Sequence, residues 1–240
     1  MKATGEQVII GESSERTEAE HQARYAFATA FVKGKRVLDI ACGTGYGAPT
    51  CIVAGATSYT GVDVSHESIL YAQTHFAQAG VEFIEASAGD TLFPDASFDI
   101  ICSFETIEHL EEEVRRAYLA NLSRWLAPDG LVIISTPNKK VTSPFSIHPL
   151  NQFHVLEYRY DELIAELSPY LIVEKMFGQR LVSRWLTNYF VRRAVRLCEI
   201  VMRRRFGIYD TPTGSEVVPY DSRVFEPRFF VLLSRPKKQS

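Results

Sequence analysis

Two carboxylates and an imidazole occur close together in the segment FETIEHL, residues 104–110. If this segment opens a helix, Glu105, Glu108 and His109 are spaced at i, i+3 and i+4 and share one face. Such a face can hold a divalent cation or supply a general base, so we predict these three residues as catalytic. The structural alternative is that the two acids only favour the beginning of a helix.

The glycine-rich segment VLDIACGTGYGA, residues 37–48, is a second chemical signal. Gly43 and Gly45 begin a match to the dinucleotide pattern GxGxxG/A, and Asp63 follows at the distance expected of a ribose-binding acid. Asp39 argues against a dinucleotide, because a carboxylate at the mouth of the first strand repels a pyrophosphate. The same carboxylate suits an ammonium or sulfonium group. The chain also has no Tyr-x-x-x-Lys pair, which weakens a prediction of hydride transfer.

Both segments require a sheet that brings them together. Short apolar runs alternate with helical patterns along the chain: RVLDIAC, YTGVDVS, VEFIEAS, FDIICSF, GLVIIST and LIVEKMF. This alternation predicts an α/β protein with a parallel sheet built from right-handed crossovers. A last run, RFFVLLSRP at residues 228–236, has no crossover helix close before it, so we expect an antiparallel last strand.

The composition is that of an ordinary globular protein of 240 residues, with 46% hydrophobic and 23% charged residues. A net charge of −3 gives no general attraction to nucleic acid or to an anionic membrane. The four cysteines have no CxxC spacing, and we expect them to be reduced in a cytoplasmic protein. No stretch has the length of a signal peptide core or of a transmembrane helix.

Four segments in order resemble the motifs of the class I S-adenosylmethionine-dependent methyltransferases: VLDIACGTGYGA, GVDVS, FPDASFDIICSFETIEHL and LAPDGLVIISTPN. The resemblance covers about residues 36–140. It implies a Rossmann-like, seven-stranded, mostly parallel sheet with helices on both faces and an antiparallel last strand. It also implies that the chain binds S-adenosylmethionine and transfers its methyl group.

The resemblance further implies which residues hold the donor. Asp39 lies beside the methionine amino group, and Asp63 takes both ribose hydroxyls, although Asp63 can also be read as a helix N-cap. The family glycine two residues after the first acid is Ala41 here, and Ser87 stands where an aspartate commonly binds the adenine amino group; Asp90 is a nearby competitor. The predicted cofactor-binding residues are Asp39, Ala41, Gly43, Gly45, Asp63, Val64, Ser87, Ala88, Ser103, Phe104 and Tyr25.

A Glu-x-x-Glu-His segment followed by a later histidine is similar to that of the ubiquinone-pathway O-methyltransferases and the small-RNA 2′-O-methyltransferases. In those families a magnesium ion holds the acceptor hydroxyls. The resemblance therefore implies Mg²⁺ as a second cofactor, and His148 and His154 follow the fifth strand. The predicted metal ligands are Glu105, Glu108, His109 and His154. The alternative is that His109 acts as a base without a metal.

The two ends of the chain carry further expectations. The segment ERTEAEHQARYAFA resembles the leader of methyltransferases found with bacterial glycan assembly, in which the N-terminal segment covers the cofactor. Arg16 and Tyr25 can then touch the donor carboxylate. Residues 179–206 contain eight arginines and a single acid, Glu199, interleaved with aromatic residues. We expect a basic amphipathic helix pair that contacts anionic lipid, a phosphorylated carrier or RNA, or else a solvated helix packed by its apolar side.

We therefore predict a single methyltransferase domain over residues 1–240. Its parts are a lid helix (1–35), the cofactor-binding core (36–178), an arginine-rich helical insert (179–222), and the final strand and tail (223–240). The expected reaction is O-methylation of a hydroxyl on a sugar or on a glycan intermediate, which can be lipid-linked. We expect a cytoplasmic protein with peripheral contact to the inner face of the membrane. The alternatives are a quinone-type phenol or an RNA ribose as acceptor, an NAD-dependent oxidoreductase, and a ligand-binding scaffold without turnover.

Overall fold

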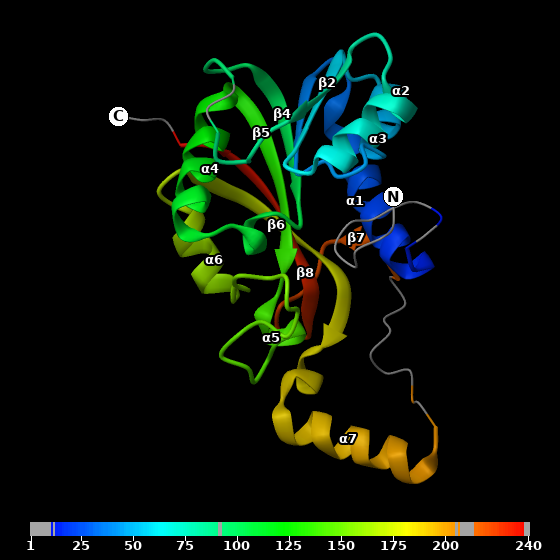
Figure 1. Ribbon diagram of the computed structural model, residues 1–240. Helices are drawn as coiled ribbons and strands as arrows, with labels where there is room; N and C mark the ends of the chain where they lie inside the picture. Colours follow the sequence, from blue (N-terminus) through cyan, green and yellow to red (C-terminus); the bar gives the residue numbers. More distant parts are fainter. Residues whose placement is uncertain (1–10, 12, 91–92, 205, 207–213, 238–240) are drawn as a thin grey trace.

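The computed structural model describes residues 11, 13–90, 93–204, 206 and 214–237. Within these residues the protein forms one sheet of strands in the order β3-β2-β1-β4-β5-β8-β6-β7 (Figure 1). The strands are β1 (Arg36–Ile40), β2 (Ser58–Asp63), β3 (Val81–Glu85), β4 (Phe98–Phe104), β5 (Leu126–Pro137), β6 (Leu171–Ser183), β7 (Val217–Val218) and β8 (Phe225–Pro236).

The first five strands are parallel, as the alternation of apolar runs and helical patterns predicts. The last strand, β8, is antiparallel to both of its neighbours, β5 and β6, so the predicted Rossmann-like α/β fold is confirmed. The predicted count of seven strands is wrong, because the described residues form eight. The additional strand, β7, has two residues, which is too short for a hydrophobic pattern to reveal.

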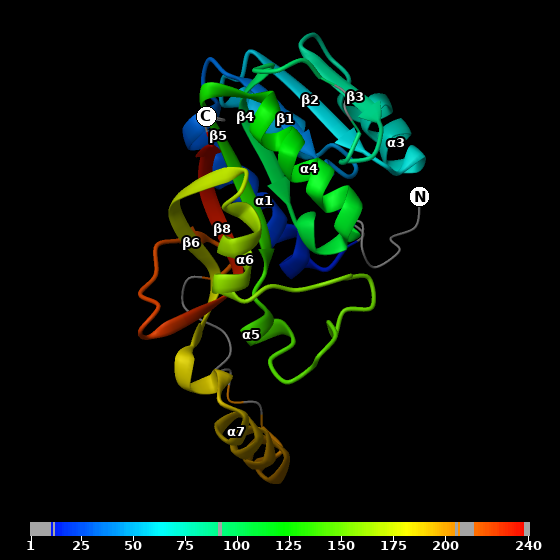
Figure 2. The ribbon, with the colours of Figure 1, turned by 90° about the vertical axis from the view of Figure 1, so that its left-hand side faces the viewer.

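Helices cover both faces of the sheet (Figure 2). One face is covered by α1 (Glu15–Val32), α2 (Gly47–Val53) and α3 (His66–Phe76), and the other by α4 (Glu112–Trp125) and α6 (Tyr160–Leu167). The strands divide their side chains between the two faces with a period of two. Val37 packs with α1 and α2, whereas its neighbour Leu38 packs with α4 and α6.

The site is positioned where the strand order reverses. From β1 the chain proceeds through β2 and β3 to one edge of the sheet, and then returns to place β4 on the other side of β1. The carboxyl ends of β1 and β4 therefore lie side by side, with Ile40 opposite Ser103. In open α/β sheets such a reversal leaves a crevice at the carboxyl ends of the strands, where ligands bind.

We had expected the segment FETIEHL to open an α-helix, and this prediction is wrong. Glu105 has a φ of 52° and ends β4, and Ile107–His109 then form a single 3₁₀ turn. The helix α4 begins only at Glu112. The left-handed backbone at Glu105 is stabilised by its N–H group, which donates to the Ser135 carbonyl at 3.0 Å.

The arginine-rich segment also differs from its prediction. Strand β6 continues to Ser183, so the first five residues of the expected helical insert belong to the sheet. In place of a helix pair, the described residues form a 3₁₀ turn, η2 (Arg184–Thr187), and one α-helix, α7 (Tyr189–Met202). Figure 1 shows α7 apart from the sheet, at the end of the molecule that also carries the short helix α5 (Lys139–Thr142). None of the described helices combines the length and the apolar character required to cross a membrane.

Candidate functional site

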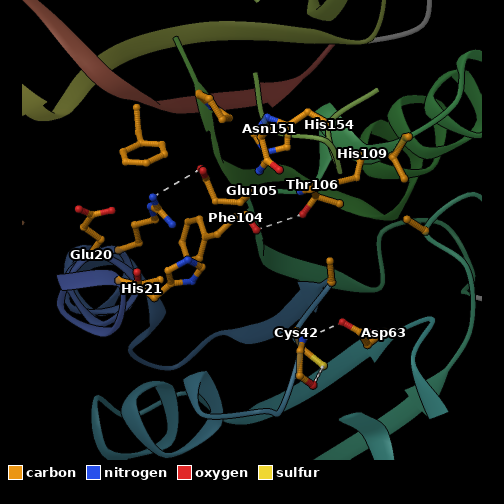
Figure 3. A pocket seen from close by; sticks show the side chains of 18 of the residues that line it. Glu20, His21, Cys42, Asp63, Phe104, Glu105, Thr106, His109, Asn151 and His154 are labelled. Carbon is orange, nitrogen blue, oxygen red and sulfur yellow. Dashed lines mark hydrogen bonds and ion pairs between the residues drawn. The ribbon is translucent and has the colours of Figure 1, made fainter. Parts of the chain in front are cut away.

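A cavity of about 1040 Å³ lies at the carboxyl ends of β1, β2, β4 and β5. Its volume is at the upper end of the range for small-molecule sites, roughly 300–1,000 Å³, so it can accept a large ligand or two smaller ones. The helix α1, the segments that follow β3 and β4, the segment between α5 and α6, and strands β6 and β8 also contribute to its walls. Figure 3 shows Cys42 and Asp63 at one end of the cavity and His109, Asn151 and His154 at the other, with Glu105 between them.

The glycine loop forms the wall at the Asp63 end. Ala41, Cys42 and Gly43 line the cavity. A side chain at Gly43 would point into open space, and its φ of 54° is left-handed. Ala41 has a φ of 60°, which explains why a glycine suits this position better. Gly45 does not line the cavity. It faces the core instead, where a Cβ atom would meet Ala72 and Phe83 at 2.7 Å.

The carboxylate of Asp63 lines the cavity and organises the loop around it. Its Oδ2 accepts a hydrogen bond of 2.8 Å from Gly43 N–H, and its Oδ1 accepts one of 2.9 Å from Ser65 N–H. Each carboxylate oxygen can accept a further hydrogen bond. The alternative that Asp63 is an N-cap is wrong, because Ser65 is the N-cap of α3 and accepts from Ser68 N–H. Val64 lines the cavity beside Asp63.

Asp39 is buried, 1% exposed, and lies outside the wall of the cavity. Its Oδ2 accepts hydrogen bonds from the hydroxyls of Tyr25, at 2.7 Å, and of Tyr59. Burial raises the pKa of Asp39 to about 7, even though both tyrosine hydroxyls favour its ionised form. Tyr25 itself lines the cavity and Asp39 does not. The predicted contact of Asp39 with a ligand would therefore be indirect, through Tyr25 or the adjacent loop.

Ser87 and Ala88 line the cavity after β3. The Ser87 hydroxyl accepts from Gly89 N–H at 3.3 Å, and Ser87 N–H donates to Asp90 Oδ2 at 2.9 Å. Asp90 is exposed and is not part of the wall, so its carboxylate shapes this loop from outside.

Of the two cofactor-binding residues predicted at the end of β4, Phe104 lines the cavity and Ser103 does not. Phe104 packs edge-to-face against Tyr25, with the ring centroids 5.1 Å apart. Ser103 is fully buried and shares a hydrogen bond of 2.7 Å with the hydroxyl of Tyr118, beneath α4.

The three residues of FETIEHL that we predicted to share a helix face have different surroundings. Glu105 lines the cavity, where its Oε1 accepts from Ser135 Oγ at 2.7 Å and lies 3.6 Å from Arg24 Nη2. Glu108 is fully buried and accepts from Thr136 Oγ1 at 2.9 Å. Burial, with a smaller contribution from the charge of Glu105, raises the pKa of Glu108 well above its usual range.

His109 lines the cavity in a defined tautomer. Its Nδ1 lies 3.1 Å from the carbonyl oxygen of Phe153. Because a carbonyl oxygen can only accept, Nδ1 carries the proton, and the lone pair of the neutral ring is on Nε2. His109 can therefore act as a base through Nε2.

His154 also lines the cavity, and Asn151 and Glu157 hold its ring in place. His154 Nδ1 lies 2.9 Å from Glu157 Oε1, and its Nε2 lies 2.8 Å from Asn151 Nδ2. Glu157 is 4% exposed. Burial alone would raise the pKa of Glu157, but hydrogen bonds from His154, Thr142 and Ser143 outweigh burial and lower it. An ionised Glu157 thus fixes the proton of His154 on Nδ1.

Residues that the sequence analysis missed also line this cavity. Arg24 is 1% exposed; its Nε donates to Gln179 at 2.9 Å, and its guanidinium lies 4.7 Å from the ring centroid of Phe229. Arg24 Nη1 is buried without a hydrogen-bond partner among the described residues. The only sequence signal for Arg24 is its position one residue before Tyr25 on the predicted lid helix.

Comparisons with known proteins agree with this geometry. Residues 37–130 match a family model described as a methyltransferase domain. A probable S-adenosylmethionine-dependent methyltransferase of Mycobacterium tuberculosis is 33% identical over 147 residues, which are 61% of this chain and 52% of that protein. Residues 37–130 are therefore similar to the methyltransferase domain of S-adenosylmethionine-dependent methyltransferases.

The chain is also similar to a ubiquinone biosynthesis O-methyltransferase of Azorhizobium caulinodans, with 30% identity over 142 residues, 56% of this chain and 54% of that protein. The chain spans about half the length of the curated relatives it matches. The crystal structure of PH0226 protein from Pyrococcus horikoshii OT3 shares its fold. That likeness has a TM-score of 0.64 and 17% identity, and it covers 94% of this chain and 93% of that one.

The cavity of this chain has groups that fit the parts of S-adenosylmethionine. Asp63 presents a carboxylate to the cavity, and Gly43 leaves room above the loop. The orphaned Nη1 of Arg24 is a buried donor for which a carboxylate is the natural partner. Ser87, which also lines the cavity, offers a hydroxyl that can accept a hydrogen bond from the adenine amino group.

The same cavity fits magnesium less well. Glu108, His109 and His154 offer ligand atoms within 4.8 Å of one another, but Glu105 is not part of this group. Magnesium prefers oxygen ligands in an octahedron, whereas the group has one carboxyl and two imidazoles. Burial also raises the pKa of Glu108, which disfavours the ionised carboxylate that a metal ion binds. The donor set is closer to what transition metals select, and Mg²⁺ stays a prediction.

Proposed function

We propose that this chain transfers the methyl group of S-adenosylmethionine to a hydroxyl oxygen of an acceptor. The observation that carries the proposal is one cavity with two differently equipped ends: the glycine loop and Asp63 at one, and His109, with its lone pair on Nε2, at the other. The relative named as an O-methyltransferase supports oxygen as the atom that is methylated.

The donor is held by groups from three elements of the chain. Asp63 binds the ribose hydroxyls through charge-assisted hydrogen bonds, and the loop that contains Ser87 and Ala88 receives the adenine. Arg24 Nη1 binds the donor carboxylate, a role for which we had predicted Arg16 and Tyr25. Tyr25 instead connects Asp39 to the cavity, because its hydroxyl is bonded to the buried carboxyl.

His109 supplies the base. When bound, S-adenosylmethionine supplies a methyl group on a positively charged sulfur, which keeps the electron pair of the carbon–sulfur bond. His109 Nε2 takes the proton of the acceptor hydroxyl as its oxygen bonds to the methyl carbon. The Phe153 carbonyl holds the proton on Nδ1 and so fixes the ring for this role. General-base catalysis of this kind contributes about 10²–10⁴-fold to a rate.

A sugar or glycan hydroxyl is the acceptor that we propose. Polar side chains that suit neighbouring hydroxyls line the end of the cavity near His109, among them Thr142, Asn151 and Glu157. A quinone-type phenol and an RNA ribose are the alternatives. Transfer of a labelled methyl group into the glycan, lipid, RNA and small-molecule fractions of a cell extract separates these acceptors. A chelator arm in the same assay tests Mg²⁺, because a metal-free base keeps full activity.

The helix α7 is the part that we propose to contact an anionic membrane. In the described structure no residue of α7 is buried. Large apolar side chains at helical spacing form one exposed face: Phe190 (77% exposed), Leu197 (61%) and Val201 (74%). Arginines lie off this face, as in helices that rest in the interface of anionic bilayers. The charge of Arg193 and Arg196 is what selects a lipid surface over a neutral apolar partner.

The first experiment separates a methyltransferase from a dehydrogenase that uses the same glycines. S-adenosylhomocysteine and NAD are added separately to the full chain, and the melting temperature is recorded. We expect S-adenosylhomocysteine alone to raise the melting temperature, because ligands stabilise the state that binds them. A shift with NAD alone would refute the proposal. A shift with S-adenosylhomocysteine but no labelled product in any fraction would make the chain a scaffold.

A further inference from the structure

Two arginines face each other on neighbouring strands at the acceptor side of the cavity. Arg180 on β6 and Arg228 on β8 both line it. The antiparallel register pairs Gln179 with Phe229 and Leu181 with Pro227, which places Arg180 opposite Arg228. Arg180 has a φ of 53°, an irregularity inside a strand of the kind that re-aims a side chain.

The two arginines differ in what neutralises them. Arg180 Nη1 lies 2.9 Å from Glu20 Oε1, so its charge is paired. The guanidinium of Arg228 makes no hydrogen bond or ion pair with any described residue; its Nε is buried, and its Cζ lies 5.9 Å from the ring centroid of Phe229. Burial and the charges of Arg180 and Arg192 lower the pKa of Arg228, a sign that the cation is poorly compensated. A cation held this way is costly unless an anion accompanies it.

The acids near Arg228 are already engaged. Glu157 accepts from His154 Nδ1 and from Thr142 Oγ1, at 2.9 and 2.6 Å. Glu20 is bound to Arg180. The end of the cavity around Arg228 therefore has an unmatched positive charge and a guanidinium fork, which suits an oxyanion.

Arg228 lies across the sheet from the glycine loop, and the ring of Phe229 lies next to both its guanidinium, at 5.9 Å, and that of Arg24, at 4.7 Å. Three strand spacings lie between β1, which carries the glycine loop, and β8. At about 4.8 Å each, these place Arg228 roughly 14 Å from the loop across the sheet. Arg24 lies on α1 and is the nearer partner for the carboxylate of the donor. This step rests on the proposed function, because it takes the Gly43 and Asp63 end as the donor site.

We propose that the acceptor carries an oxyanion, a phosphate or a carboxylate, and that Arg228 binds it. The acceptor is thus an anionic hydroxy compound, such as a sugar phosphate or a sugar acid. Arg228 fixes the end of the acceptor opposite to the hydroxyl that His109 deprotonates, while the charge of Arg180 beside it is paired with Glu20. Such a contact holds the acceptor in one orientation and so selects which hydroxyl is methylated.

The test uses the full chain with inorganic phosphate and with acetate as probes, each against sodium chloride at the same ionic strength. At ten times its dissociation constant, phosphate raises the melting temperature of the unmodified chain by about 3–6 °C. In Arg228→Gln this shift disappears. In Arg235→Gln, which removes an exposed arginine from the same strand, the shift is unchanged. The acetate arm shows whether carboxylates bind as phosphate does.

Saturating S-adenosylhomocysteine separates this inference from the proposed function. If Arg228 binds the acceptor, the phosphate shift persists on top of the S-adenosylhomocysteine shift. Loss of the phosphate shift in its presence would assign the arginine to the donor carboxylate and overturn the inference. Equal phosphate shifts in the unmodified chain and in Arg228→Gln, or none in either, also overturn it. If Arg228→Gln does not fold, Arg228→Lys, which keeps the charge without the fork, must show a reduced shift.

Failure of the proposed function has a different signature. In that case S-adenosylhomocysteine gives no shift in the unmodified chain, whatever phosphate does. Binding of S-adenosylhomocysteine must be equally tight in Arg228→Gln and in the unmodified chain, because the donor does not touch Arg228. A tenfold loss of this affinity in Arg228→Gln would contradict the inference even where phosphate behaves as expected.

Discussion

The hydroxyl of Tyr25, on the N-terminal helix, donates a hydrogen bond of 2.7 Å to the buried carboxyl of Asp39, on β1. This bond ties α1 to the strand that leads into the glycine loop. Gly47 makes the arrangement possible, because a Cβ atom at that position would lie 2.1 Å from the ring of Tyr25. The acid that precedes the glycines therefore joins α1 to the strand that leads into the glycine loop.

Asp39 gives stability a pH dependence of defined sign. Because the folded pKa, about 7, is higher than the usual 3.8, the folded protein keeps this proton to higher pH than the unfolded chain. The contribution is complete below pH 4 and is lost as the pH rises through 7, on the order of 4 kcal/mol in all. We expect Asp39→Asn to be less sensitive to pH than the unmodified chain in urea unfolding at pH 5 and 8. Equal sensitivity would show that Asp39 is ionised throughout.

Asp63→Ala should weaken binding of S-adenosylhomocysteine about 100-fold, on the order of 3 kcal/mol, because two charge-assisted hydrogen bonds to the ribose are lost. Titration calorimetry measures this change. Glu85→Ala is the matched control, since Glu85 lies opposite Asp63 on β3 but pairs with the exposed His66. Because Asp63 also accepts from Gly43 and Ser65, the melting temperature without ligand shows whether the loop still folds. Wild-type affinity in a folded Asp63→Ala would remove the ribose role.

His109→Ala should keep the affinity for S-adenosylhomocysteine and lower kcat about 10²–10⁴-fold, because it removes the base and leaves the donor end intact. The labelled-methyl assay measures turnover, and calorimetry measures binding. His75→Ala, which changes a histidine exposed on α3, should have the activity of the unmodified chain. An unchanged kcat in His109→Ala would show that another group lining the cavity takes the proton of the acceptor hydroxyl.

Glu108→Gln distinguishes a metal-free base from a metal site. Burial raises the pKa of Glu108 and so favours its neutral form, and glutamine has nearly the same shape without the charge. We therefore expect turnover within about threefold of the unmodified chain, as for isosteric changes that cost under about 1 kcal/mol. A loss beyond 100-fold, partly restored by an added divalent cation, would show that Glu108 is a metal ligand. The measurement is kcat with and without chelator.

Leu197→Glu should weaken binding to anionic vesicles at least tenfold, because it places a charge in the exposed face of α7. Leu70→Glu, at a 55% exposed leucine on α3, should leave binding unchanged. Co-sedimentation with vesicles of phosphatidylglycerol and phosphatidylcholine measures this difference. Binding should also fall as salt is added, since arginines contribute to it. Equal binding to vesicles of phosphatidylcholine alone would show that charge is not involved.

The parallel part of the sheet could be predicted because each of its strands is a buried apolar run next to a helical pattern. Strand β7 could not, since two residues contain no periodicity. The segment after β4 was misread because its spacing suits a helix, whereas Glu105 takes a left-handed backbone that depends on Ser135, thirty residues away.

Residues of the candidate site were predicted where they follow a strand within a motif, as Asp63 does. Arg24, Glu157 and Arg228 come from three separate parts of the chain, and each alone reads as an ordinary charged residue. Only the folded sheet brings them to one cavity. Their function depends on which charges are left unpaired, and a sequence does not contain that information.

The position of β8 sets an order of assembly during synthesis. This strand follows β6 and α7 in the chain, yet it lies between β5 and β6 in the sheet. Until residues 225–236 leave the ribosome, β5 has no neighbour on that side, and β6 can pair only with the two residues of β7. The glycine loop and Asp63 are complete long before then, whereas Arg228 arrives last. A nascent chain could thus bind its donor while the acceptor wall is still missing, and donor binding could stabilise the half-built sheet.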